Sequence, residues 1–248
     1  MTKTPQELEL MREGGKKLGI ILQDLLEFLK AGVALLDIDA RADRLIVEAG
    51  GSASFKTVRG YKWATCLCIN DVVVHGVPTE YKLKKGDVCT IDIGMFYKGL
   101  HTDTAWTKIV GGQNDAFLRV GETALWKAID QAKSGNYVGH ISRTIEDSIV
   151  GAGYSIVKSL VGHGVGKMLH EDPQIPGFLK GSIEETPRLD VGMTIAIEVI
   201  YAKGSGQVNY DHPDGWTVAT VDRSVSAVFE HTVAISENGP LVLTKVDT

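Results

Sequence analysis

Two strongly apolar segments of the sequence each carry one carboxylate where a core side chain would be expected. Residues 192–200 read GMTIAIEVI and place Glu198 among aliphatic neighbours, and residues 86–94 read GDVCTIDIG and place Asp92 at the same distance from a leading glycine. Apolar residues on both sides of an acid are typical of a strand that is covered on both faces. Because a buried, unpaired carboxylate is costly, each of these acids requires a cationic partner or a metal ion.

A second acidic strand follows each of these segments. The segment LHTDTAWTKIV carries Asp103, and the segment SAVFEHTVAIS carries Glu230. A two-residue turn at residues 98–99 would set Asp92 opposite Ala105 and leave Asp103 on the same face of the hairpin. The repeated arrangement of a glycine-led strand and a second acidic strand hints at an internal duplication.

Ordinary explanations for these acids differ between the two pairs. Asp92 and Asp103 could lie on the solvated face of an alternating hairpin, and the sequence leaves this alternative open. Glu198 and Glu230 could belong to buried ion pairs, but neither of their segments contains a lysine or an arginine. Four strand acids without evident cations of their own favour a metal site.

The predicted elements follow the order helices, strands, helices, strands. Apolar residues recur at helical spacing over residues 6–30, 37–51, 114–134 and 141–152. Strand-like segments fill the interval between the helical pairs and the C-terminal part, with hairpins predicted at residues 98–99 and 70–71. Since no low-complexity linker separates these groups, the pattern predicts an α+β fold.

The composition argues against nucleic acid and membrane partners. The 248 residues are 44% hydrophobic and carry a formal net charge of −5, with no basic run that would bind DNA or an anionic membrane. No apolar stretch approaches the roughly 20 residues that a membrane span needs, and the start MTKTPQELELMREGGKK is too charged for a secretory signal. We therefore expect a cytoplasmic protein, by default a monomer. The three cysteines are expected to be reduced thiols: Cys66, Cys68 and Cys89.

Three of the seven histidines stand in settings typical of a functional site, although a lone histidine is more often structural or exposed. His163 lies in GHGVG, where glycines let a backbone or a ligand approach closely. His170 follows seven residues later, and His75 ends an all-valine segment. His231 follows Glu230, so strand alternation turns its side chain away from the direction that Glu230 faces. The remaining three are expected at the surface: His101, His140 and His212.

Four strand carboxylates and one imidazole in a glycine-rich loop describe a metal site. Oxygen-rich ligation with one histidine suits Mn, Fe, Co or Zn, whereas a cysteine-rich structural zinc site is excluded by composition. Four acids exceed what one divalent ion needs. Two ions about 3.5–4 Å apart, sharing two of the acids, would neutralise them and activate a water for hydrolysis.

Other motif interpretations fail on detail. GHGVGK is one residue short of a phosphate-binding loop, and HEDP lacks the second histidine of the HExxH metalloprotease helix. The sequence also has no G-x-S-x-G nucleophile elbow.

These residues, in this order, resemble the type I methionine aminopeptidases, which have the pita-bread fold. The resemblance covers nearly the whole chain and includes NDVVVHGVP, IDIG with HTDTA, GHGVGKMLHEDPQIPGF and GWTVATVDRSVSAVFEHT. It implies antiparallel sheets covered by helices, in a single catalytic domain over residues 1–248 with pseudo-symmetric halves at roughly 1–110 and 111–248. It also implies removal of the N-terminal methionine from nascent proteins and peptides, with preference for a small second residue.

The resemblance implies two divalent metal ions and assigns their ligands. Asp92 would bind one ion, and Asp103 and Glu230 would bind both. His163 and Glu198 would complete the shell of the second ion. Glu198 would also be the catalytic proton shuttle, a role that suits a carboxylate beside the attacking water.

The resemblance further implies a substrate site around the metal ions. His75 and His170 would be catalytic as well as substrate-binding, through hydrogen bonds to the scissile peptide and its developing negative charge. An apolar slot for the methionine side chain would be walled by Tyr61, Cys66 and Trp216, although core packing is the ordinary alternative for such residues. Two further residues are candidates for this wall: Leu169 and Phe178. The partners would be peptide or nascent-chain N-termini, with a transient ribosome contact as an option.

Three positions depart from the family pattern. Val199 and Lys62 stand where proline is common, and Gly177-Phe178 stand where Asn-Tyr is usual. None of them is a metal ligand, so they bear on the shape of the pocket. Two alternatives stay open: a proline-directed exopeptidase of the same fold, and a non-catalytic relative that binds protein or RNA.

Overall fold

The computed structural model describes residues 2–245, in which ten strands form one large sheet and three strands form a small one. The large sheet contains β1 (Ser52–Ala53), β2 (Thr65–Ile69), β4 (Val88–Tyr97), β5 (Leu100–Ile109), β6 (Ser155–Ile156), β7 (Val161–Gly164), β8 (Glu171–Pro176), β9 (Thr194–Ala202), β12 (Ser226–Ser236) and β13 (Gly239–Val242). The small sheet contains β3 (Val72–Val74), β10 (Val208–Asn209) and β11 (Val218–Thr220).

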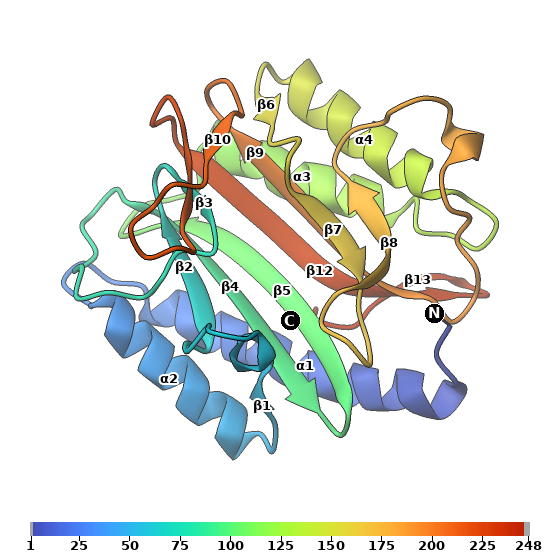
Figure 1. Cartoon of the computed structure of the whole chain (residues 1–248), viewed down its shortest axis with the longest axis horizontal. Coiled ribbons are helices and arrows are strands. Elements are labelled where there is room, and N and C mark those ends of the chain that lie inside the picture. Colours follow the sequence, from blue (N-terminus) through green and yellow to red (C-terminus); the bar gives the residue numbers. More distant parts are fainter. Residues whose placement is uncertain (1, 246–248) are drawn as a thin grey trace.

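The large sheet joins the two parts of the sequence through its middle. Its main path runs β1-β4-β5-β12-β9-β7-β8, and β2, β6 and β13 add to β4, β9 and β12 (Figure 1). The pairings in both sheets are antiparallel. Helices, strands, helices and strands follow one another as predicted, so the α+β fold class is confirmed.

The four predicted helices are confirmed, with ends that shift by a few residues. They are α1 (Pro5–Phe28), α2 (Leu35–Glu48), α3 (Ala116–Ile129) and α4 (Val138–Gly151). Two 3₁₀ turns lie between strands: η1 (Ser54–Thr57) and η2 (Ile183–Glu185). Helix α1 begins at a capping box in which the Thr4 side chain accepts the Glu7 N–H and the Glu7 carboxylate accepts the Thr4 N–H. Among residues 2–245, no helix combines the length and the apolar character that crossing a membrane requires.

The helices cover one face of the large sheet, and in the view of Figure 1 α1 and α3 pass behind its strands. Helices α1 and α2 pack on the strands of the first part through a core that includes Leu18 and Ile91. Helices α3 and α4 pack on the strands of the second part through a core that includes Phe117 and Phe229. The opposite face of the sheet is left to loops and the small sheet, so it is the face where a site can open.

The hairpin predicted at residues 98–99 is confirmed. Lys98 and Gly99 have φ angles of 49° and 90°, the left-handed values that a two-residue hairpin turn requires. Asp92 lies opposite Ala105, and Asp103 lies opposite Gly94 on the same face.

The hairpin predicted at residues 70–71 is wrong as a strand pairing. The chain does turn there, since Asn70 has a φ of 57°, but β2 pairs with β4 and β3 pairs with β11. The reason lies in the side chain of Asn70, which accepts the N–H of Val88 and donates to Asp87. These bonds tie the turn to the start of β4, and β3 leaves to join the small sheet.

Two glycines open the acidic strands in the same way. Gly86 and Gly192 precede β4 and β9 with φ angles of 95° and 91°, values that favour glycine. Each donates its N–H to a carbonyl of the antiparallel neighbour, that of Val110 directly after β5 and that of Ile235 on β12, at 2.9 Å in both cases. The spacing of glycine and acid noted in the sequence therefore corresponds to matching local structure.

Candidate metal centre and active site

The register of the large sheet places three acids in one transverse row. Asp92 on β4 lies opposite Ala105 on β5. The same Ala105 lies opposite Glu230 on β12, which lies opposite Glu198 on β9. Residues directly opposite on neighbouring strands point to the same face, so the three carboxylates face the same way. Cys66 on β2, opposite Asp92, extends this row.

The next row supplies the other two candidate ligands. Asp103 precedes Ala105 by two residues and exchanges hydrogen bonds with Thr232, its N–H donating to the hydroxyl at 2.9 Å and its carbonyl accepting at 2.7 Å. Ala196 lies opposite Thr232 on one side and His163 on the other. Since residues two apart share a face, both rows point into the same space.

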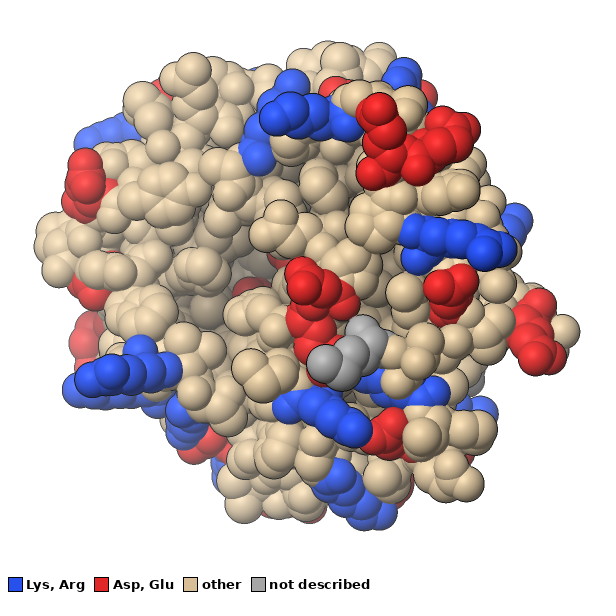
Figure 2. Space-filling model, turned by 45° about the vertical axis from the view of Figure 1, so that its right-hand side comes forward, with Lys and Arg blue, Asp and Glu red and all other residues tan. Residues whose placement is uncertain are grey.

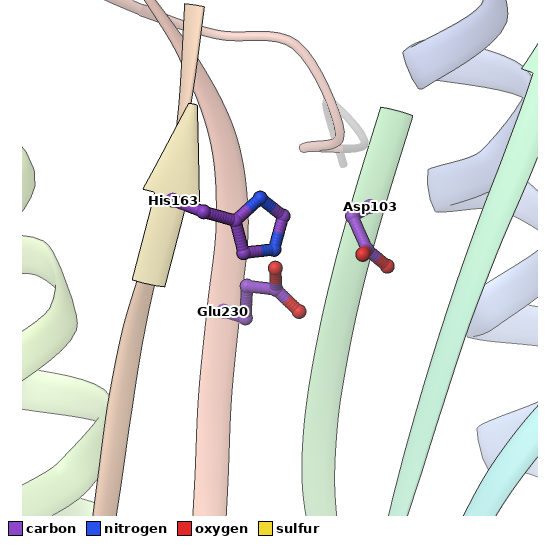
Figure 3. A group of neighbouring side chains, drawn as sticks. All are labelled: Asp103, His163 and Glu230. Carbon is purple, nitrogen blue, oxygen red and sulfur yellow. The ribbon is translucent and has the colours of Figure 1, made fainter. Parts of the chain in front are cut away.

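The side chains of Asp103, His163 and Glu230 converge in this space (Figure 3). One ligand-type atom from each of them lies within 4.8 Å of the others. They come from three different strands, β5, β7 and β12. The pairing of these strands in the sheet, and not a short sequence motif, therefore brings the three side chains together.

His163 is held in an orientation suited to a metal ligand. Its Nδ1–H donates to the carbonyl of Gly164 at 2.8 Å, which leaves Nε2 as the free lone pair, 3.5 Å from Oε1 of Glu198. The flanking glycines let neighbouring strands approach, because a side chain at Gly162 would collide with the carbonyl oxygen of Ala196. The GHGVG motif thus serves close strand packing around an oriented imidazole.

The four acids are enclosed by protein and by one another. Asp103 and Glu230 are buried, and Asp92 and Glu198 are half-buried because they border the cavity. Burial first, and repulsion from Asp103 second, raise the pKa of Asp92, Glu198 and Glu230 well above the usual carboxyl range. Burial raises the pKa of Asp103 to about 7, although an N–H from Thr104 opposes this shift.

The ligand set fits a divalent cation. Among the described residues, no lysine or arginine forms a salt bridge with Asp92, Asp103, Glu198 or Glu230. Oδ1 of Asp92 and Oε1 of Glu230 are buried without a hydrogen-bond partner in residues 2–245. Buried carboxylate oxygens that lack protein partners are the donors that a divalent ion would satisfy. The ion-pair alternative for Glu198 and Glu230, and the solvated-face alternative for Asp92 and Asp103, are therefore both unsupported.

The acids lie at one cavity of about 590 Å³. A hollow is visible on one face of the molecule, and its walls are mainly neither acidic nor basic (Figure 2). His75 and His170 line the same cavity, and the rings of His163 and His170 meet edge to face at 4.4 Å. Burial lowers the pKa of both His75 and His170, which keeps their imidazoles neutral near pH 7. His75 also holds a φ of 56°, a strained value for a residue with a side chain.

An aromatic slot forms one end of the cavity. Tyr61 lies edge to face against Trp216 at 5.1 Å, and its hydroxyl donates to the carbonyl of Thr65 at 2.8 Å. The residues of the slot pack as one cluster: Phe55, Tyr61, Cys66 and Leu169, with Trp216 and Val58 at its edge. Phe55 and Val58 were not singled out in the sequence, where a lone aromatic within GSASFKTVRG gives no signal of its own.

Two expected side-chain positions are wrong. Phe178 does not line this cavity; it borders a second depression beside α4, where Lys158 stacks on its ring. His101 is not at the surface, because it shares the buried face of β5 with Asp103 and accepts or donates a 2.9 Å hydrogen bond with Ser54 Oγ.

Other expectations about single residues hold. His212 is exposed, and His140 is half-buried on α4. His231 points to the helix side, where its ring contacts Trp106 and Trp126. Two of the departures from the family pattern leave the cavity untouched, since Val199 points into the core under the helices and Lys62 is exposed.

Comparison with known proteins agrees with this geometry. The model of metallopeptidase family M24 matches residues 9–237. The chain is 41% identical over 247 residues to methionine aminopeptidase 1 of Bacillus subtilis, with 98% of each chain covered. It resembles the crystal structure of methionine aminopeptidase from Thermotoga maritima, with a TM-score of 0.94, 39% identity and 99% of both chains covered. The prolidase from Pyrococcus furiosus, at 23% identity and a TM-score of 0.79, shares the fold over all of this chain and 66% of its own.

Proposed function

Because the chain belongs to metallopeptidase family M24, we propose that it is a methionyl aminopeptidase with the pita-bread fold. It removes the N-terminal methionine from peptides and nascent proteins. The observation that carries this proposal is the pair of sheet rows that gathers four carboxylates and one imidazole beside an aromatic slot. The close relatives that carry the name methionine aminopeptidase match nearly the whole chain.

Two divalent metal ions, Co, Mn, Fe or Zn, would be held by Asp92, Asp103, His163, Glu198 and Glu230. The support is the number of acids, since one divalent ion would leave charge uncompensated among four carboxylates, of which Asp103 and Glu230 are buried and the other two half-buried. When bound, the ions would supply Lewis acidity at the scissile carbonyl and a nucleophilic water at neutral pH.

Glu198 is proposed as the residue that moves the proton. Its carboxylate faces the cavity, and its Oε1 lies 3.5 Å from His163 Nε2. A carboxylate whose basicity is increased by burial can take the proton of the attacking water. The same oxygen then delivers the proton to the amine nitrogen that leaves with the second residue.

His75 and His170 are proposed to act on the scissile peptide group. Both imidazoles line the cavity and are kept neutral by burial. A neutral imidazole N–H donates a hydrogen bond to the carbonyl oxygen, where negative charge develops in the transition state. Such a donor is worth more in the transition state than in the bound substrate, so it raises the rate of the chemical step.

The aromatic slot is proposed to bind the methionine side chain. Tyr61, Cys66 and Trp216 offer apolar surface and ring edges, which a thioether contacts favourably. Leu169 closes the same cluster. The preference for a small second residue is proposed from the likeness to the methionine aminopeptidases.

The organisation and setting are part of the same proposal. Residues 1–248 form a single catalytic domain whose halves, roughly 1–110 and 111–248, each contribute one acidic hairpin. The enzyme acts as a cytoplasmic monomer on free N-termini, with a transient contact to the ribosome. The sequence's net charge of −5 supports the absence of a nucleic acid partner.

A panel of three peptides tests the function. Metal-loaded protein is incubated with Met-Ala-Ser, Met-Leu-Ser and Ala-Pro, and released amino acids are measured. We expect methionine from the first peptide alone. Cleavage of Ala-Pro would favour the proline-directed exopeptidase, and no cleavage with any of the four ions would favour the non-catalytic alternative.

A further inference from the structure

The segment that carries His170 is held by contacts from distant parts of the chain. Residues 165–170 connect β7 to β8 without regular secondary structure. The Thr194 hydroxyl on β9 donates to the carbonyl of Val165, and the N–H of His101 on β5 donates to the carbonyl of Gly166 at 2.6 Å. The position of the imidazole therefore depends on what anchors this segment.

A third anchor comes from the start of the chain. The N–H of Lys3 donates to the carbonyl of Gly192 at 2.7 Å, which fixes the N-terminal arm beside the start of β9. Its Nζ lies 2.6 Å from Oε2 of Glu171, the residue directly after His170. The Lys3 side chain is 2% exposed and the Glu171 side chain 9% exposed, so this pair is buried.

Glu171 links the lysine to the turn that contains His170. Its second oxygen, Oε1, accepts the N–H of Met168 at 3.1 Å. The stem of Lys3 lies directly against Gly166, where an added side chain would collide with its Cε and Nζ. Lys3 thus packs against one end of the segment and neutralises the carboxylate at the other.

We propose that Lys3 is a positioning residue for His170. Its buried ion pair with Glu171 sets the turn that presents the imidazole to the cavity. The inference rests on the proposed role of His170 in the aminopeptidase reaction. Lys3→Met would remove the 2.6 Å ion pair that the Glu171 carboxylate makes inside the protein, and the loss of such a buried contact favours opening of the turn towards water. An opened turn would displace the imidazole, and a displacement of about 1 Å can reduce a rate on the order of 100-fold.

The test is a double-mutant cycle with Lys3→Met and His170→Ala in the full-length, metal-loaded protein. Release of methionine from Met-Ala-Ser gives kcat and KM, and metal content and thermal unfolding are measured for each variant. We expect Lys3→Met to lower kcat by about 10- to 100-fold, with a smaller change in KM. In the His170→Ala background the same substitution should change kcat less than about 2-fold, because the residue it acts through is gone.

Matched variants separate positioning from general destabilisation. Lys167 lies on the same segment as His170, but it is 66% exposed and pairs with Glu7 on α1, so Lys167→Met should leave kcat within about 2-fold. Lys3→Arg, which keeps the charge, should restore part of the rate. If Lys3→Met does not fold, Glu171→Gln takes its place in the cycle. The inference is overturned if the rate loss is equal in both backgrounds, or if Lys3→Met retains full kcat. A wild-type protein that releases no methionine would instead overturn the proposed function.

Discussion

Asp103→Asn should stabilise the metal-free protein, although it should abolish the activity of the metal-loaded protein. Asp103 is buried within the acid cluster, and its charge is the largest source of electrostatic repulsion for Glu198 and Glu230. Asparagine has nearly the same shape, and its Oδ1 can still accept the 3.1 Å hydrogen bond from the N–H of Thr104. The substitution therefore removes a charge while keeping the packing.

The size of the effect follows from the pKa of Asp103. Burial raises this pKa from 3.8 to about 7 in the folded protein. Between these values the folded state binds more protons than the unfolded state, so this group makes stability fall as the pH rises. At pH 8 nearly the whole pKa shift lowers the free energy of unfolding, by roughly 4 kcal/mol, and at pH 5.5 the loss is about half as large. For a chain of this length, 4 kcal/mol corresponds to a Tm increase on the order of 10 °C.

The assay is thermal and urea unfolding of both proteins after chelator treatment, at pH 5.5 and pH 8. Buried histidines such as His163, whose pKa is lowered to about 4, give the opposite trend with pH, but they do so in both proteins. The difference between the variants isolates Asp103. Adding Mn²⁺ afterwards should stabilise the wild type far more than the asparagine variant.

The reasoning is refuted if the asparagine variant is less stable than the metal-free wild type at pH 8. It is also refuted if the stability difference fails to grow from pH 5.5 to pH 8. Either result would mean that Asp103 is compensated by a group of the protein itself.

Three further predictions concern catalysis. Glu198→Gln should lower kcat by about 10²- to 10⁴-fold while the circular dichroism spectrum and peptide binding are retained; full activity would contradict its role in proton transfer. Protein stripped by a chelator should be inactive and should recover with a divalent transition metal, and activity that survives thorough stripping would rule out metal catalysis. Trp216→Ala should lower kcat/KM for Met-Ala-Ser on the order of 10-fold by removing one wall of the slot, whereas an unchanged value would place the methionine side chain elsewhere.

The acidic candidate ligands could be identified from the sequence, because the free-energy cost of burying a carboxylate is evident from its immediate neighbours in the chain. Glu198 and Asp92 stand among aliphatic neighbours, and that conflict is visible without any knowledge of the fold. Strand alternation then gave the common face of Asp92 and Asp103 correctly, since it depends only on the length of one tight turn. Strand alternation does not reveal which strands are neighbours in the sheet. The arrangement of the strands was implied only by the resemblance to a family.

The wrong predictions concern positions that are determined by contacts with residues far away in the sequence. His101 looked like a surface residue because its partners, Ser54 and Gly166, lie far away in the sequence. The pairing of β3 with β11 depends likewise on a strand about 140 residues downstream. Phe178 was placed by analogy, and a single aromatic side chain does not reveal which of two neighbouring depressions it borders.

The junction of β5 and β12 has a consequence for how the molecule acquires activity. Asp103 and Thr232, which form hydrogen bonds across this junction, are 129 residues apart in the chain. The pairing of β5 with β12 therefore closes one of the longest loops in the fold. Pairings between segments so far apart in the chain form slowly, because the long loop between them must be closed first. Neither sequence half on its own would gather all five proposed metal ligands. During refolding, catalytic turnover should therefore return only once β5 has paired with β12, later than the helical circular dichroism signal.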